Sequence, residues 1–164
     1  MENTFLIENL RNHFEQDIFE MNTNTDMLTV TVSYPVIHDV IRYLKEDPAL
    51  NFTFLTTLCG IHYPDRGLPL GVIYHLHNIY ENQRIRIKTF VTLNEPKVPT
   101  ITDLFAAANW MERETYDFYG IVFEGHPDLK RILNVEYLDF FPMRKEYPLE
   151  DPTREDKDDR YFGR

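Results

Sequence analysis

The sequence predicts an α+β fold: a two-layer domain in which helices cover one face of a mixed, mostly antiparallel sheet, followed by an extended C-terminal tail. Three observations support this prediction. The 164 residues suit a single domain, and 43% of them are hydrophobic, which is enough for a substantial core. Segments of helical and strand periodicity follow in the order helix, strand, helix, three strands, helix. We place the α+β domain at residues 1–141 and the tail at residues 142–164.

Three elements are expected in the N-terminal third of the chain. Apolar residues recur every three or four positions between Thr4 and Phe19, which predicts an amphipathic first helix. From Leu28 onward, apolar and hydroxyl side chains alternate, which predicts a half-buried strand that ends before Pro35. A second helix is expected to follow, because apolar residues again line one face until Pro48 stops the pattern.

Three strand-like segments occupy the middle of the chain, at residues 51–63, 68–80 and 83–93. Only a short polar link, residues 81–83, separates the last two, and we therefore expect them to form a hairpin.

The third helix is expected to begin near Ile101, where Thr100 and Asp103 match a capping box, and to end at Gly120. Residues at helical spacing form its predicted core-facing stripe. They are Ile101, Leu104, Phe105, Ala108, Met111, Thr115 and Phe118.

The opposite stripe of the third helix, which we expect to face away from the core, carries Trp110, Arg113, Glu114 and Asp117. Arg113 and Asp117 are four positions apart and can pair along the helix. Charged residues are typical of a solvated face, whereas Trp beside Arg is common at the centre of protein interfaces. Two interpretations of this stripe stay open, a solvated surface and an anchor for a partner protein.

A catalytic role for Glu112, Glu114, Asp117 and His126 is a further possibility. Acid–base catalysis needs titratable groups that converge on one point. Glu112 and Glu114 diverge by about 200° around a helix, and Arg113 and solvent are expected to keep Glu114 and Asp117 ionised. His126 precedes Pro127 in a turn that we expect to lead into a short helix, where its ring can hydrogen-bond a helix end. The pattern therefore does not favour an independent active site.

The strand-like segments carry two pairs of observations with alternative meanings. His75 and His77 share a strand face, but two ligands are too few for a metal site, and a solvated or interfacial face is the simpler interpretation. The alternating bases Arg84, Arg86 and Lys88 can mark a solvated edge or the docking place of an acidic partner. Cys59 is expected to be a small buried hydrophobe.

Composition excludes several classes of function. The formal net charge of -10 argues against non-specific nucleic-acid binding, which needs a basic surface. A single cysteine rules out an internal disulfide and any cysteine-ligated cluster within the chain. No apolar run is long enough to cross a membrane. We therefore expect a soluble, acidic domain without a metal or cofactor of its own.

The predicted tail, Pro142–Arg164, is rich in charge and proline. Its bases nearly balance its acids, and it cannot bury enough apolar surface to offset the entropy of ordering. We expect it to be mobile in the free protein and ordered in a complex, with Tyr161 and Phe162 buried against a neighbour. A terminus without a role is the alternative.

The segment "ERETYDFYGIVFEGHPDLKRIL", residues 112–133, resembles the signature of the 30-kilodalton subunit of NADH-quinone oxidoreductase (respiratory complex I). The preceding "VPTITDLFAAANWMERE" and the following "PMRKEYPLED" are similar to the segments that flank this signature in the family. The residues in register with the signature are Glu112, Arg113, Glu114, Asp117, Tyr119, Gly120, Phe123, Gly125, His126, Pro127, Leu129, Arg131 and Leu133.

The resemblance implies a structural subunit in the hydrophilic arm of a proton-translocating enzyme of the respiratory chain. That arm carries electrons from NADH through FMN and iron–sulfur clusters to quinone. The resemblance further implies that these cofactors belong to partner subunits and that this chain has no active site of its own. Its partners are then other arm subunits, above all the quinone-cavity subunit and the iron–sulfur subunits. It is expected at the cytoplasmic face of the cell inner membrane, as a peripheral part of the complex.

The surface that docks onto these partners is predicted from the signature and the tail. It comprises Trp110, Arg113, Glu114, Asp117, His126, Arg131, Arg144, Lys145, Tyr161 and Phe162. Two alternatives stay open: the equivalent subunit of a related membrane-bound hydrogenase or other donor–quinone oxidoreductase, and a free-standing enzyme that uses the Glu112–His126 cluster.

Overall fold

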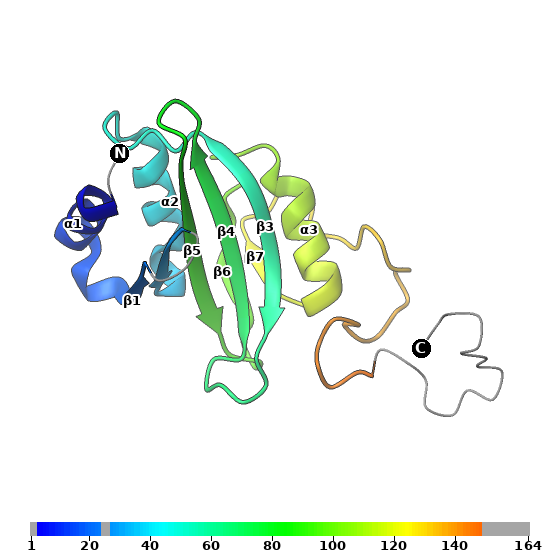
Figure 1. Cartoon of the computed structure of the whole chain (residues 1–164). Helices are drawn as coiled ribbons and strands as arrows, with labels where there is room; N and C mark the ends of the chain where they lie inside the picture. The colour runs from blue at the N-terminus through cyan, green and yellow to red at the C-terminus, as the bar shows by residue number, and fades with distance from the viewer. Residues whose placement is uncertain (1–2, 24–26, 149–164) are drawn as a thin grey trace, which may run out of the picture.

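The computed structural model describes residues 3–23 and 27–148 and has the α+β architecture expected from the sequence (Figure 1). A five-stranded sheet has the strand order β1-β2-β5-β4-β3, and β6 and β7 form a separate pair. Only β2 and β5 run parallel in the large sheet. The helices are α1 (Asn3–Phe14), α2 (Ile37–Glu46) and α3 (Ala108–Tyr119). The strands are β1 (Ile18–Asn22), β2 (Leu28–Val32), β3 (Phe54–His62), β4 (Leu70–Asn78), β5 (Gln83–Val91), β6 (Lys97–Pro99) and β7 (Val122–Glu124).

The first helix is shorter than its apolar periodicity predicts. It ends at Phe14, a 3-10 turn follows, and Ile18 begins the unpredicted strand β1. Pairing of β1 with β2 makes the difference, because this tertiary contact overrides the local helical pattern. Only Leu6 and Leu10 of α1 are fully buried, and Phe5 is 41% exposed.

The strand β2 is more deeply buried than the expected half-buried strand. It lies between β1 and β5, so that Leu28, Val30 and Val32 enter the core and even Thr29 is only 6% exposed. The second helix matches its prediction. Its apolar stripe packs entirely into the core, and it follows a short 3-10 turn that contains Pro35.

The three long strands form the expected antiparallel arrangement, and β4 and β5 form the predicted hairpin around Asn82, which has a φ of 49°. Alternate residues of these strands point into the core on one face of the sheet. The helices pack on that face: α2 contributes to the same core, and a Cβ at Gly60 of β3 would lie 2.4 Å from the Tyr119 ring of α3. The other face, which we call the open sheet face, carries Thr57, Cys59, Ile73, His75, His77, Arg84, Arg86, Lys88 and Phe90. Cys59 is exposed, so the prediction of a buried thiol is wrong.

The third helix begins at Ala108 rather than near Ile101. Residues 102–107 form turns instead, and the expected capping box at Thr100 and Asp103 does not cap the helix. Gly120 ends the helix as predicted, in the left-handed conformation with a φ of 72°, and its N–H donates to the Tyr116 carbonyl. The parallel pair of β6 and β7, which the sequence did not predict, returns the chain beside the segment that leads into α3. Figure 1 shows α3 beside β3, and α1 and α2 beside the other edge of the sheet.

Candidate interaction surface around α3

Beyond β7 the chain has almost no regular structure, yet α3 holds it in place. We call residues 125–148 the C-terminal strap. It contains the turn at His126 without the short helix that we expected after Pro127. The first part of the predicted tail, residues 142–148, belongs to this strap, whereas Tyr161 and Phe162 lie outside the described residues.

Asp117 is the main anchor of the strap. Its carboxylate accepts hydrogen bonds from the backbone N–H groups of Ile132 (3.1 Å), Leu133 (2.8 Å) and Asn134 (2.8 Å), and from the Asn134 amide (3.1 Å). It also forms an ion pair with Arg131 at 2.7 Å. Burial alone would raise the pKa of this carboxyl, but these donors together hold the pKa well below its usual range.

The outward placement predicted for Asp117 is therefore wrong. The side chain is 0% exposed, because the strap covers that part of α3. The pairing expected between Asp117 and Arg113 does not form either. Arg113 instead donates from Nε to the Lys130 carbonyl (3.2 Å) and from Nη2 to the Arg131 carbonyl (3.3 Å). Both residues of α3 thus hold the strap rather than each other.

Arg131 connects distant parts of the strap with α3. Besides the Asp117 carboxylate, its guanidinium donates to the Asp117 carbonyl (2.9 Å) and to the carbonyls of Leu138 (2.7 Å) and Phe140 (3.1 Å). The guanidinium also lies 5.1 Å from the Phe141 ring centroid. Because carbonyls of an irregular segment need donors when they are shielded from water, this single side chain organises residues 131–141.

The end of the strap is fixed by the tail residues predicted at the interface. Arg144 donates from Nε to the Tyr119 carbonyl (2.8 Å) and lies 4.7 Å from the Phe141 ring centroid. The backbone N–H of Lys145 donates to Nδ1 of His62, at the end of β3 (2.9 Å). These contacts hold the strap as far as Lys145 against the α+β domain.

His126 links the beginning of the strap to the first turn of α3. Its Nδ1 accepts a hydrogen bond from the Asp128 N–H (3.0 Å), so Nε2 carries the proton and donates to the Asn109 carbonyl (3.0 Å). The imidazole is therefore neutral in this arrangement. It bonds near the start of a helix rather than at a helix end.

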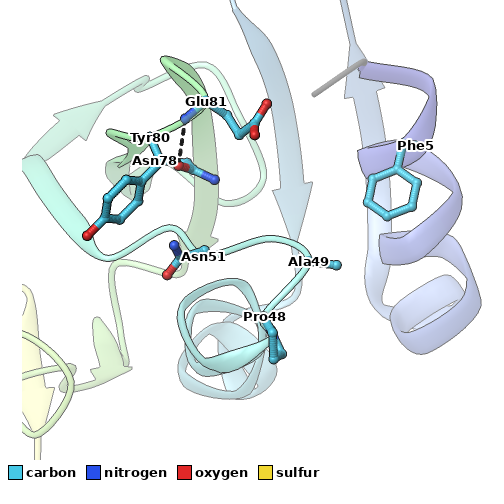
Figure 2. Close-up of a pocket in the computed structure, with 7 residues that line it drawn as sticks. All are labelled: Phe5, Pro48, Ala49, Asn51, Asn78, Tyr80 and Glu81. Carbon is cyan, nitrogen blue, oxygen red and sulfur yellow. Dashed lines mark hydrogen bonds between the residues drawn. The ribbon is translucent and has the colours of Figure 1, made fainter.

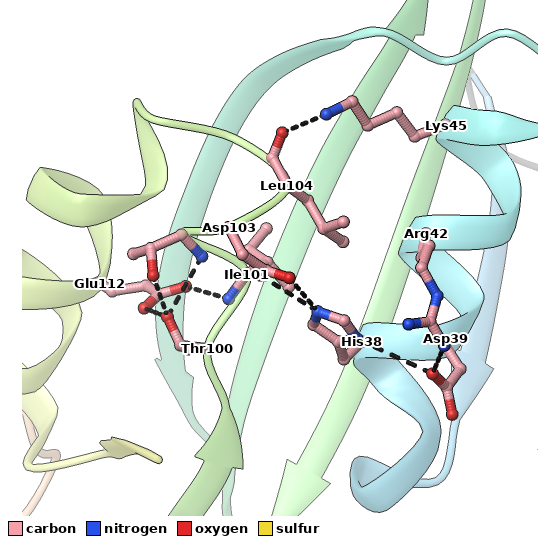
Figure 3. Close-up of polar contacts among 10 residues, drawn as sticks. His38, Asp39, Arg42, Lys45, Thr100, Ile101, Asp103, Leu104 and Glu112 are labelled. Carbon is pink, nitrogen blue, oxygen red and sulfur yellow. Dashed lines mark hydrogen bonds and ion pairs between the residues drawn. The ribbon is translucent and has the colours of Figure 1, made fainter. Parts of the chain in front are cut away.

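Glu112 faces the core on the other side of α3 (Figure 3). Its carboxylate accepts hydrogen bonds from the Thr100 hydroxyl (2.5 Å) and the Ile101 N–H (2.8 Å), and the residue is 0% exposed. Burial raises the pKa of Glu112 to about 7, although these two hydrogen bonds oppose the change. Nearby, His38 of α2 bonds Asp103 at 2.9 Å, so two polar contacts tie the turns at 102–107 to both helices.

The side of α3 that carries Trp110 remains on the surface. Trp110 is 59% exposed and Glu114 is also exposed, as expected from the helical pattern. Trp110 borders a shallow groove, whose other lining residues are Thr102, Asp103, Ala106, Asn109, Gly125 and Pro127. A second pocket lies far away along the chain, between α1, the segment after α2 and the β4–β5 turn, where Phe5 and Tyr80 line it (Figure 2).

The strap exposes large apolar side chains on its outer side. Their exposed fractions are 65% for Leu133, 48% for Val135, 87% for Tyr137, 45% for Met143 and 38% for Tyr147. The polar groups of the strap bond inward while these apolar groups point outward. Aromatic residues and Met are enriched at protein interfaces, and a group of exposed apolar side chains marks an interaction surface.

The four candidate catalytic groups do not meet. Glu112 contacts the 100–101 backbone segment, Glu114 is exposed, Asp117 holds the strap and His126 bonds Asn109 and Asp128. Among the described residues, no group of three or more His, Cys, Asp or Glu side chains is placed to hold a metal ion, and no helix is long and apolar enough to cross a membrane.

An α+β domain that fixes an irregular segment with its apolar side outward is typical of a subunit that packs against other proteins. Residues 30–153 match the family described as the respiratory-chain NADH dehydrogenase 30 Kd subunit. The chain belongs to this family, as its resemblance to the signature predicts.

Relatives and solved structures agree with this assignment. An NADH-quinone oxidoreductase subunit of Maricaulis maris is 43% identical over 74% of this chain and 60% of its own length. The subunit of the same name from Roseiflexus sp. is 40% identical over 91% of this chain and 86% of its own. This chain spans only about 60% of the length of the first of these relatives.

Two solved structures share the fold. One is the trypsin-resistant fragment 1–134 of Nqo5, with a TM-score of 0.67 and 31% identity, which aligns over 79% of this chain and 100% of that one. The other is a chain of the membrane-bound sulfane sulfur reductase, an archaeal respiratory membrane complex. It aligns over 91% of this chain and 87% of its own, with a TM-score of 0.75 and 23% identity.

Proposed function

We propose that this chain is a structural subunit of the hydrophilic arm of a proton-translocating NADH-quinone oxidoreductase. Its role is to hold neighbouring subunits in place while electrons pass from NADH through FMN and iron–sulfur clusters to quinone. The family assignment supports the enzyme, and the strap with its exposed apolar side chains supports the structural role. The partners proposed are the quinone-cavity subunit and the iron–sulfur subunits, at the cytoplasmic face of the cell membrane.

The composition of the native assembly tests this proposal. A tagged copy of the chain, expressed in its native cell and purified in mild detergent, is expected to recover subunits that carry FMN and iron–sulfur clusters, with NADH-quinone oxidoreductase activity. Recovery of the chain alone would contradict the proposal. An assembly without NADH- and flavin-binding subunits would support the alternative, a related membrane-bound hydrogenase or other donor–quinone enzyme. That alternative is retained because an archaeal respiratory complex contains a chain of the same fold.

The isolated chain is expected to be colourless, to contain no stoichiometric flavin, iron or zinc, and to leave NADH unoxidised. One thiolate, on Cys59, and histidines that do not cluster in the described residues cannot hold an iron–sulfur cluster. Absorption spectra, metal analysis and NADH turnover of the purified chain check this expectation. Turnover by the isolated chain would instead favour the free-standing enzyme.

Replacing Arg113 by Ala is expected to weaken assembly while the isolated domain stays folded. Arg113 bonds two strap carbonyls at the domain surface, so its loss should lower the free energy of unfolding by at most about 1 kcal/mol. If a partner also buries this charge, truncation costs about 2–5 kcal/mol of binding. Thermal melting of the isolated variant and its co-purification with arm subunits separate the two effects. A normal melt with full assembly would return this side of α3 to a solvated surface.

A further inference from the structure

Positive charge gathers on the open sheet face, away from α3 and the strap. Arg84, Arg86 and Lys88 alternate along β5 and therefore point to the same side of the sheet. Directly across on β4, His77 pairs with Arg84 and His75 pairs with Arg86 in the strand register. The helices pack on the opposite face, so this basic row is not covered by the fold itself.

The basic row is held in position rather than loosely solvated. Arg86 donates from Nε to Nε2 of His75 (2.7 Å) and lies within 3.4 Å of the Thr29 hydroxyl. Arg66, from the loop after β3, lies over the rings of Tyr63 and Phe90, at 4.4 Å and 5.4 Å from their centroids. Stacking on Phe90 places this further cation at the end of the same face.

These cations repel one another. Partial burial lowers the pKa of Lys88, and the charges of Arg86 and Arg66 lower it further, while Glu20 on β1 only partly offsets them. The chain has 27 acidic and 17 basic residues, so a patch of this sign is the reverse of its average. Like charges placed together raise the free energy of the unbound domain, and an anionic partner would relieve that cost.

We propose that the basic row of the open sheet face docks an acidic, extended polypeptide segment of a neighbouring subunit. This inference rests on the proposed function, since it assigns a second contact surface to the same structural subunit. Residues two apart on a strand are separated by about 6.6–6.8 Å. An extended segment with acidic residues at alternate positions has the same spacing, so it can pair with Arg84, Arg86 and Lys88 in register.

The surroundings of the row favour a protein over other anions. Ile73, Phe90 and the 49% exposed Phe54 lie on the same face and offer apolar contact to the side chains of a polypeptide. Nucleic acids and anionic membranes present a dense and extended negative charge. They would be repelled by a chain of net charge -10, whereas a short acidic segment needs only the local patch.

Zero-length carbodiimide cross-linking of the wild-type assembly tests the contact directly, because the reagent joins a lysine amine to a carboxylate that touches it. Lys88 is expected to be joined to an Asp or Glu of another subunit and to become protected from amine acylation relative to the isolated chain. A cross-link from Lys88 to residues 149–164 of the same chain, or equal acylation in both states, would overturn the proposal.

Charge reversal supplies a second measurement. Arg84→Glu combined with Lys88→Glu is expected to reduce the recovered assembly about tenfold or more. Arg86 is left intact because it bonds His75 and Thr29. Arg11→Glu with Arg42→Glu is the matched control, since both bases are exposed on helices and the change in net charge is equal.

The outcomes separate this inference from the proposed function. Wild-type recovery of FMN and iron–sulfur subunits, with loss in the β5 variant alone and an unchanged melting temperature, supports both. Wild-type recovery together with full assembly of the β5 variant overturns the acidic docking segment and leaves the proposed function intact. Failure of the wild-type chain to recover any arm subunit overturns both.

Discussion

Replacing Asp117 by Ala is expected to destabilise the isolated domain by about 3–5 kcal/mol, the usual cost of removing one partner from a buried ion pair. The change leaves the Arg131 guanidinium, which is only 9% exposed, without its carboxylate. It also leaves the backbone N–H groups of residues 132–134 without their acceptor, and unsatisfied donors shielded from water are costly. The strap should detach from α3 even where the sheet still folds.

Glu114→Ala is the matched control for this variant, because Glu114 is an exposed acid on the same helix, three positions away. Urea unfolding of both variants gives the stability difference, and limited proteolysis within residues 125–148 reports whether the strap has detached. A loss of less than about 1 kcal/mol in Asp117→Ala would show that solvent replaces the carboxylate readily and that Asp117 does not anchor the strap.

The Asp117 contribution has a defined pH dependence. The folded-state pKa of this carboxyl lies below the unfolded value of about 3.9. The stabilisation is therefore complete at neutral pH and is lost as the pH falls below about 4, because the proton must first be removed for the carboxylate to accept its hydrogen bonds. Wild-type and Asp117→Ala proteins should thus converge in stability in acid.

Local patterns predicted the elements whose state depends on their own residues. The apolar stripe of α2, the three long strands and the glycine end of α3 are confirmed, because each pattern is regular and long. Strand β1 was missed since Ile18 continues the helical spacing of α1, and only pairing with β2 makes it a strand. The exposed position of Trp110 on α3 was predicted correctly for the same local reason.

The site around Asp117 could not be predicted from helical periodicity. Periodicity shows which residues of α3 face the sheet, but not what covers its other sides. The cover comes from residues 131–134, more than a helix length further along the chain, and they have no regular pattern of their own. Arg131 and Asp117 both lie within the family signature, which placed them in one motif without showing that they bond each other.

Glu112 is expected to make the domain less stable as the pH rises. Its pKa is about 4.5 in the unfolded chain and about 7 in the fold, so the folded state favours the protonated carboxyl. No penalty exists below about pH 4. It grows between pH 4.5 and 7 and levels off near 3 kcal/mol above that range, because each pKa unit corresponds to about 1.4 kcal/mol.

Glu112→Gln should remove this pH dependence. A glutamine can accept the Ile101 N–H through its carbonyl oxygen and donate from its amide to the Thr100 oxygen, so the contact between α3 and the segment before it survives without a charge. The stability difference between variant and wild type, measured by urea unfolding, should therefore shift in favour of the variant by about 3 kcal/mol between pH 5 and pH 8. Glu114→Gln, at an exposed position on the same helix, should give a curve parallel to the wild type. Parallel curves for Glu112→Gln as well would mean that the buried carboxyl is ionised at no cost, and that water or its two donors compensate for burial.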